Sequence, residues 1–286
     1  MSNITFPGLG WEFNPPRGFT IPGTEFTIYF YGVIIALGLV LSVVYGLRRC
    51  RQFGLKQDDI LDGVLWIVPL AIVCARAYYV VFELDQYHSF ADVINIRKGG
   101  LAIYGGVIGA ALGIVIFAKA KKVSLSAVLD LVGIAFLIGQ SIGRWGNFIN
   151  REAYGAPTDF FLRMGLVVGG EQGYYHPTFL YESVWNALGF VLLHFLSKKR
   201  QYDGQMALGY VAWYGLGRTF IEGLRMDSLY WGPFRVSQLL AAVSCLVAVV
   251  TLLVMSFRAH DRKKLFVCYV DKMEAAEEAA KKVYNQ

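Results

Sequence analysis

The chain has 286 residues, of which 56% are hydrophobic and 17% are charged, with a net charge of +6 and a mean hydropathy of +0.46. Soluble domains are about 45–50% apolar and about 25% charged, so a soluble enzyme, a disordered chain and a disulfide scaffold are excluded. The composition predicts an all-α polytopic membrane protein. The four cysteines lack metal-ligand spacing, which predicts free thiols and neither a metal nor another cofactor. The first 20 residues lack the charged and apolar regions of a cleavable signal peptide.

Seven apolar segments have the length of about 20 residues that a helix needs to cross a bilayer. They cover approximately 26–47, 60–82, 101–118, 125–143, 178–196, 205–224 and 236–257. Seventeen of the 27 Lys and Arg residues fall in one alternating set of loops and the C-terminal tail, and six fall in the other set. The positive-inside rule then places the N-terminus outside and the C-terminus in the cytoplasm.

These assignments predict two parts. Residues 1–257 form a seven-helix membrane domain with a small extracytoplasmic head made from loops, at about 144–177. Residues 258–286 form a polar cytoplasmic tail.

Two segments carry glycines at every fourth position. Gly105, Gly109 and Gly113 lie in the third segment, and Gly139 and Gly143 lie in the fourth. Small residues at this spacing let helix backbones approach closely in lipid, so we expect helix packing. The alternative is that they make room for an acyl chain.

Charged side chains within apolar segments are costly and usually serve a function. Arg76 lies in the second segment and Glu182 lies early in the fifth. Each needs a partner, and a long-range contact between the two is one hypothesis. His176 precedes the fifth segment at the expected membrane boundary, where it either titrates or has a structural role.

The fourth segment continues into G-R-W-G-N-F-I-N-R-E-A-Y-G at 143–155. Arg144 and Asn147 supply donors and Glu152 supplies a carboxylate, which indicates a polar cluster at the outer membrane face. The alternative is that Arg144 extends toward water while the loop caps the helix.

Four polar residues near the end of the sixth segment are spaced for one helical face: Tyr214, Arg218, Glu222 and Arg225. Two arginines and one glutamate leave a net charge of +1. The stripe is either a self-neutralising ion pair or an anion site, in which Glu222 orients one arginine and leaves donors for a phosphate.

Together these motifs resemble the bacterial phosphatidylglycerol–prolipoprotein diacylglyceryl transferase family, over about residues 20–257. The matching segments are Tyr31-Gly32, G-G-L-A-I-Y-G-G at 99–106, the 143–155 motif, H-P-T-F-L-Y-E at 176–182 and G-R-T-F-I-E-G-L-R at 217–225. The resemblance implies a multi-pass enzyme of the bacterial plasma membrane. It would move the diacylglyceryl group of phosphatidylglycerol onto the lipobox cysteine of a secreted prolipoprotein and release glycerol phosphate. No nucleic acid is expected to bind, and a monomer is expected.

The resemblance and the polar clusters together give the expected site. The expected catalytic residues are Arg144, Arg218, Glu222, Tyr104 and Glu152. The residues expected to bind phosphatidylglycerol are Arg144, Asn147, Tyr31, Asn150, Gly155, Arg225 and His176.

Tyr104 departs from the family pattern, because many relatives have a histidine there that is a candidate base for the thiol. A tyrosine with a pKa near 10 is a poor base at pH 7. Three explanations remain: a phenolate held by Arg144, a hydrogen-bond donor only, or a base elsewhere, with His176 or Glu152 in reach. We favour the donor and leave the base unassigned.

Three other functions fit the same topology. The main alternative is a transporter or channel for an anionic lipid or solute, with the intramembrane charges along its path. The others are an enzyme that transfers a phospholipid group to a small acceptor, and a membrane scaffold without catalysis.

Overall fold

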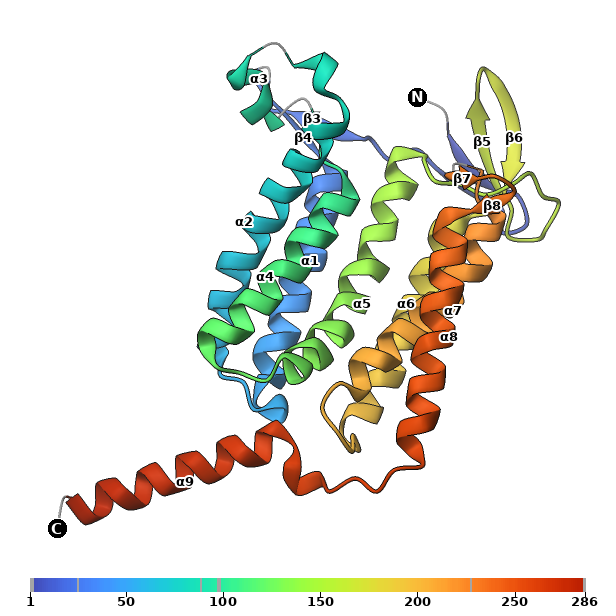
Figure 1. The fold of residues 1–286 in the computed structure, drawn as a ribbon. Helices are drawn as coiled ribbons and strands as arrows, with labels where there is room; N and C mark the ends of the chain where they lie inside the picture. Colours follow the sequence, from blue (N-terminus) through green and yellow to red (C-terminus); the bar gives the residue numbers. More distant parts are fainter. Residues whose placement is uncertain (1–2, 25, 88, 97–98, 227, 285–286) are drawn as a thin grey trace. The chain divides into compact units, whose positions relative to one another are not determined.

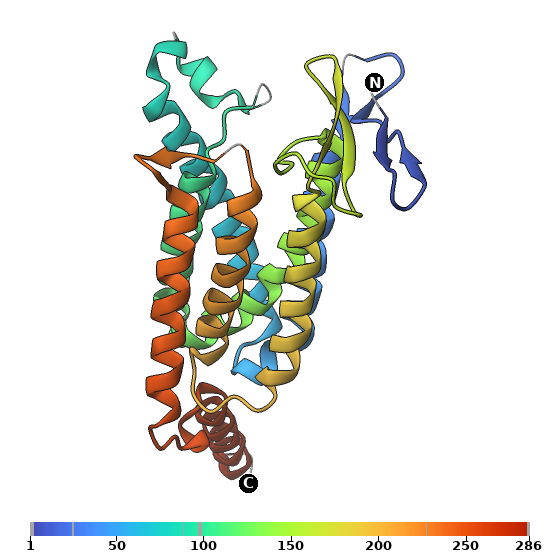
Figure 2. The same ribbon diagram turned by 90° about the vertical axis from the view of Figure 1, so that its right-hand side faces the viewer.

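The structure is a computed structural model that describes residues 3–284 apart from 25, 88, 97–98 and 227. The chain divides into two compact units, drawn in Figure 1 and Figure 2. The first unit contains residues 1–45 and 132–261, and the second contains residues 46–131 and 262–286.

The helices of the first unit are long and follow the apolar segments. They are α1 (Phe30–Arg49) and α5 (Leu125–Asn150), each in large part, and α6 (Thr178–Ser197), α7 (Gln205–Leu224) and α8 (Val236–Ser256). Helix α7 packs against both α6 and α8. A Cβ atom added to Gly38 of α1 would lie 3.3 Å from Gly139 of α5, which confirms that Gly139 serves close helix packing.

A small antiparallel sheet covers one end of these helices. Its strands are β1 (Ile4–Phe6), β2 (Trp11–Phe13), β5 (Met164–Val168) and β6 (Glu171–Tyr175), in the order β2-β1-β5-β6. Ile4, Phe6, Met164 and Leu166 form its buried core with Phe179 from the first turn of α6. This core fixes the sheet to the helix that carries Glu182.

The expectation of helices alone is therefore wrong outside the apolar segments. Two further hairpins join β3 (Gly18–Thr20) to β4 (Thr27–Tyr29) and β7 (Tyr230–Trp231) to β8 (Phe234–Arg235). Strands of two to five residues are too short for their alternation to be recognised in a sequence.

The second unit is built on an antiparallel pair of helices, α2 (Gln57–Phe82) and α4 (Ile103–Lys121). A Cβ atom at Gly105 would lie 2.4 Å from the carbonyl oxygen of Cys74, and one at Gly109 would lie 2.6 Å from the Cβ of Cys74. The glycines of α4 thus serve packing on α2, as expected. The other helical elements are η1 (Cys50–Phe53), η2 (Leu84–Gln86), α3 (Phe90–Ile94), η4 (Arg262–Lys264) and α9 (Phe266–Tyr284).

Within the described part of the chain, six helical segments are long and apolar enough to cross a membrane. They are residues 30–53, 57–82, 103–121, 125–150, 178–197 and 236–256. Exposed apolar side chains such as Leu65, Trp66 and Leu246 suit contact with lipid. The chain is therefore a multi-pass membrane protein. Of the seven expected spans, the sixth, which is α7, has the expected bounds but is not among these six helices, since Arg218 and Glu222 make it less apolar.

Candidate functional site

Glu182 joins two helices through its carboxylate. It lies in the first turns of α6 with its side chain 3% exposed, and it forms ion pairs with arginines of α5 and α7. Arg144 donates from Nη2 to Oε1, and Arg218 donates from Nη1 to Oε2 over 3.1 Å. A buried carboxylate that bridges two guanidinium groups holds both in fixed positions.

A second carboxylate, Glu222, extends the cluster along α7. Arg218 Nη2 lies 2.6 Å from Glu222 Oε2, and Arg225 Nε lies 3.9 Å from the same atom. The Ser228 hydroxyl donates to Glu222 Oε1 over 2.9 Å, and Arg235 Nη1 donates to the Glu222 carbonyl oxygen. The spacing of Arg218, Glu222 and Arg225 therefore does place them on one face.

The cluster carries more positive than negative charge. Within the described residues, Arg144, Arg218 and Arg225 form ion pairs with Glu182 and Glu222, and these five groups together carry a net charge of +1. A guanidinium has five N–H donors, and Arg144 and Arg218 each use two of their nitrogen atoms in bonds within the described chain. The remaining donors suit an anion such as a phosphate.

Asn147 connects Arg144 to the loop after α5. Its Oδ1 accepts from Arg144 Nη1 over 3.1 Å, and its Nδ2 donates to Glu152 Oε1 over 3.0 Å. Asn150 Nδ2 also donates to Glu152 Oε1, over 3.4 Å. Helix α5 continues to Asn150 rather than ending near 143. Four of the expected site residues thus form one hydrogen-bonded chain.

Two glycines permit close contacts beside this chain. A Cβ atom at Gly146 would lie 2.6 Å from Cδ2 of Tyr31, so the Tyr31 ring lies directly on α5. A Cβ atom at Gly155 would lie 2.7 Å from the Cβ of His176 and 3.0 Å from the Leu224 carbonyl oxygen. Gly155 therefore lets the 143–155 segment pass between the start of α6 and the end of α7.

His176 takes part in the site mainly through its backbone. Its carbonyl accepts from Gly155 N over 2.9 Å, and its amide donates to the Ala156 carbonyl over 3.1 Å. Its Nδ1 lies 3.3 Å from the Tyr181 hydroxyl. Burial lowers the pKa of the His176 imidazole below its usual range, which favours the neutral form. These contacts fit the structural interpretation of His176.

Tyr104 belongs to the second unit. It lies in the first turn of α4 and is 44% exposed. Its expected role as a hydrogen-bond donor stays a prediction.

Sequence reasoning missed part of the cluster. The sequence identifies Glu182 only as a charge that needs a partner. In the structure, Glu182 pairs with Arg144 and Arg218 instead of the hypothesised Arg76. Ser228 and Arg235 follow α7, and only the fold brings them to Glu222. The one feature of the sequence that points to Ser228 and Arg235 is their position shortly after the charged face of α7.

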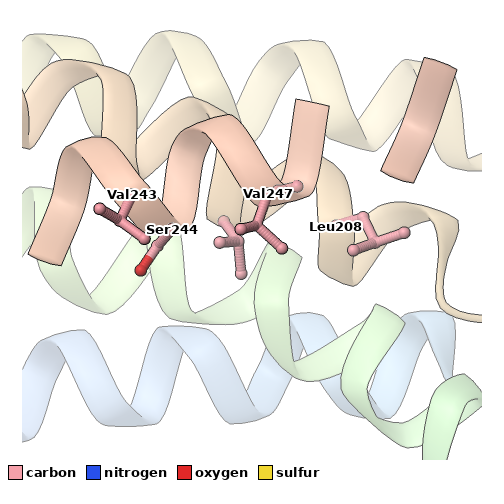
Figure 3. A pocket seen from close by; sticks show the side chains of 6 residues that line it. Leu208, Val243, Ser244 and Val247 are labelled. Atoms are coloured by element: carbon pink, nitrogen blue, oxygen red, sulfur yellow. The ribbon is translucent and has the colours of Figure 1, made fainter. Parts of the chain in front are cut away.

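An apolar groove lies elsewhere, between α7 and α8 (Figure 3). It has a volume of about 310 Å³ and is lined by Leu208, Val211, Val243, Ser244, Val247 and Ala248. The Ser244 hydroxyl donates to the Leu240 carbonyl of its own helix. The residues that line the groove carry no charge, whereas the arginine–glutamate cluster does.

Comparison with known proteins gives consistent matches. A family model described as prolipoprotein diacylglyceryl transferase matches residues 16–254. The chain is 44% identical over 250 residues to phosphatidylglycerol–prolipoprotein diacylglyceryl transferase 1 of Clostridium perfringens, covering 84% of this chain and 95% of that protein. It is 42% identical over 244 residues to the transferase of Listeria monocytogenes serovar 1/2a, covering 81% and 86%. It is 44% identical over 241 residues to the transferase of Enterococcus faecalis, covering 79% and 86%.

Proposed function

Because the chain belongs to the prolipoprotein diacylglyceryl transferase family, we propose that it transfers the diacylglyceryl group of phosphatidylglycerol to the cysteine thiol of a prolipoprotein. This is the first step of lipoprotein maturation in bacteria. The observation that carries the proposal is the pairing of Arg144 and Arg218 with one buried carboxylate, Glu182. That arrangement presents fixed cationic donors to an anionic headgroup.

The length and packing of α7 support a seven-span topology. Its 20 residues are about 30 Å long, enough to cross the hydrocarbon core. It packs between α6 and α8, where its polar face contacts Glu182 and its other residues can meet apolar neighbours. With α7 as the sixth of seven spans, the basic loops lie in the cytoplasm and the N-terminus lies outside.

This topology predicts on which side of the membrane the arginine–glutamate cluster lies. The C-terminal ends of α5 and α7 and the N-terminal end of α6 meet at Glu182. All three ends are extracytoplasmic when the N-terminus is outside. The site then opens toward the outer leaflet of the plasma membrane, where a secreted prolipoprotein presents its lipobox cysteine.

The reaction forms one C–S bond and breaks one C–O bond. The cysteine sulfur attacks the glyceryl carbon that bears the phosphodiester, and glycerol phosphate leaves with the electron pair of the broken bond. Negative charge therefore grows on phosphate oxygens as the bond breaks. Donors of Arg144, Arg218 and Arg225 are placed to stabilise that charge, and preorganised donors are worth most in a dry site.

The thiol must also lose its proton. A free cysteine has a pKa near 8.5, and a nearby positive charge lowers it. The net charge of +1 in the cluster favours the thiolate in this way. The proton leaves with glycerol phosphate or through a base, and Glu152 is the carboxylate at the end of the hydrogen-bonded chain that runs from Arg144 through Asn147.

The other residues hold this arrangement. Glu182 and Glu222 orient the arginines, and Asn147 and Asn150 fix Glu152. Tyr31 lies beside Gly146 at the edge of the cluster. Tyr104 acts as a hydrogen-bond donor, Gly155 and His176 shape the headgroup pocket, and the enzyme works as a monomer without a cofactor.

A transfer assay tests the proposal. The purified protein is mixed with phosphatidylglycerol and a lipobox peptide, and we expect the peptide cysteine to gain the mass of a diacylglyceryl group. Phosphatidylcholine in place of phosphatidylglycerol should give no product. No mass change, under conditions in which the Listeria transferase reacts, would disprove the proposal. Glycerol phosphate released without any peptide would instead indicate a small acceptor.

A further inference from the structure

Arg76 is a buried arginine of α2 whose N–H donors are all occupied by backbone carbonyls. Its Nε donates to Val93 over 2.7 Å. Its Nη1 donates to Gly99 over 3.0 Å and to Gly100 over 2.8 Å. Its Nη2 donates to Asp92 over 2.8 Å and to Asn95 over 3.1 Å. A guanidinium has five N–H groups, so none is left for a substrate anion.

These carbonyls belong to a stretch with little regular structure of its own. Within it, α3 has five residues and Gly99 and Gly100 have φ values of 89° and 82°. Figure 1 shows α3 beyond the adjoining ends of α2 and α4. Backbone carbonyl groups are strong acceptors, and here one buried side chain donates to five of them, on residues that are themselves exposed or half-buried. The Arg76 Cζ also lies 4.9 Å from the centre of the Tyr87 ring.

A backbone hydrogen bond next to these contacts holds the start of α4. The Ala102 amide donates over 3.1 Å to the carbonyl of Ala75, the residue before Arg76. Helix α4 begins at Ile103, so Tyr104 lies two residues after this bond. Arg76 and its neighbour thus fix both the approach to Tyr104 and the first turn that carries it.

We propose that Arg76 is a positioning residue for Tyr104. It is not a catalytic residue, because its donors are consumed by the protein. It sets the path of the chain that delivers the Tyr104 hydroxyl, and it therefore acts on the rate of transfer. This inference rests on the proposed transferase function, within which Tyr104 is a donor.

Two variants disturb the same contacts by different routes. Arg76→Lys keeps the charge but has three N–H donors on one atom, which cannot reach all five carbonyls. Gly100→Ala keeps Arg76 but places a Cβ atom 2.2 Å from its Nη1, at a φ that side chains rarely adopt. Arg51→Lys is the matched control, since Arg51 lies in the same unit with its side chain 67% exposed and pairs with Glu274.

The experiment measures transfer kinetics and amide hydrogen exchange on the full-length chain in nanodiscs. We expect Arg76→Lys and Gly100→Ala each to lower kcat about 2- to 10-fold, and no more than Tyr104→Phe does, because both act through the Tyr104 hydroxyl. The KM for phosphatidylglycerol should stay within threefold. Exchange should accelerate at residues 92–104 and remain unchanged in the middle of α2 and in α5–α7. Arg51→Lys should match the wild type in both measurements.

Each other outcome is decisive. A wild-type kcat in Arg76→Lys overturns the inference. Faster exchange along the whole of α2 and α4 also overturns it, because Arg76 would then support the fold in general. If the wild-type chain transfers nothing, the proposed function fails separately. The exchange pattern then decides whether Arg76 holds residues 92–104, and unchanged exchange there overturns the inference.

Discussion

The two units hold an arginine of an apolar helix in different ways. In the first unit, the half-buried Arg144 and Arg218 share the carboxylate of Glu182 and keep donors that no described residue uses. In the second unit, Arg76 gives all its donors to backbone carbonyls. The first arrangement can accept an anion, and the second cannot. Burial of a charge in a membrane protein therefore does not identify a binding residue until its donors have been counted.

The partners also decide how each arginine is held. A carboxylate supplies a full charge from a side chain, so Glu182 holds both Arg144 and Arg218 in position. Carbonyl dipoles supply partial charges from the main chain, so the position of Arg76 depends on the backbone path of residues 92–100. Loss of the carboxylate should disturb charge, and loss of the carbonyl contacts should disturb backbone position.

The largest effect should come from the cluster arginines. Arg144→Ala and Arg218→Ala each remove donors from the leaving phosphate, and we expect transfer to fall by about 10³-fold or more. The lysine variants keep one charge without the planar fork and should retain partial activity. Product formation by mass spectrometry measures the loss.

Arg163→Ala is the control for these variants. Arg163 lies against the Tyr174 ring, with its Cζ 5.3 Å from the ring centre, away from the glutamate pairs. It should retain wild-type transfer. Activity in Arg144→Ala or Arg218→Ala near that of the control would mean that the cluster is a structural ion pair.

Removal of the shared carboxylate should have the next largest effect. Glu182→Gln keeps the shape but places an amide N–H₂ against one of the two guanidinium groups. We expect kcat/KM to fall about 10²-fold, and the free energy of unfolding to fall by roughly 3 kcal/mol, because a buried ion pair loses one partner. Enzyme kinetics and thermal unfolding in detergent measure the two losses.

Glu171→Gln is the matched control, since Glu171 is exposed in β6. It should change neither quantity. Full activity in Glu182→Gln would show that Arg144 and Arg218 keep their positions without the carboxylate. The claim that a carboxylate holds these two arginines, whereas backbone carbonyls hold Arg76, would then be wrong.

The sequence predicts the long helices well and the cluster in part. Apolar length locates α7, and glycine spacing identifies Gly105 and Gly139 as packing residues. Spacing within one helix also pairs Arg218 with Glu222. These features depend on residues that are close in the sequence, and the spacing of residue types along the chain reveals them.

Contacts between distant segments escape such reasoning. The bond of Glu182 to Arg144 joins two helices, and no local spacing relates the two residues. The partners of Arg76 are backbone carbonyls, which have no signature in the sequence because every residue has one. The sheet of β1, β2, β5 and β6 joins the N-terminal region to residues 164–175 for the same reason.

A smaller effect is expected from a change at Tyr104. This variant tests the role of the hydroxyl that Arg76 is proposed to position. Tyr104→Phe removes one hydrogen-bond donor, and we expect kcat to fall about 2- to 10-fold. Unchanged kinetics would exclude a donor role for the hydroxyl. A fall of about 10³-fold or more would instead indicate that Tyr104 acts on the thiol proton.

The smallest effect concerns His176, the one group of the expected site that can lose its charge near neutral pH. Burial lowers its pKa in the folded chain, whereas the unfolded chain keeps a value of about 6.5. Above pH 6.5 both states hold a neutral imidazole. As the pH falls below 6.5, the unfolded state takes up a proton first, so stability is lost.

The thermal midpoint of the wild type should therefore fall more than that of His176→Gln between pH 7 and pH 5. Differential scanning fluorimetry at matched ionic strength measures both curves. A wild type that gains stability on acidification would mean that the imidazolium pairs with a carboxylate, which would make the positive charge of this region depend on pH. If the wild-type midpoint falls more than that of His176→Gln, as expected, His176 adds no stabilising positive charge to the site. The positive charge of the site then comes from Arg144, Arg218 and Arg225, and it stays constant over the pH range of the assay.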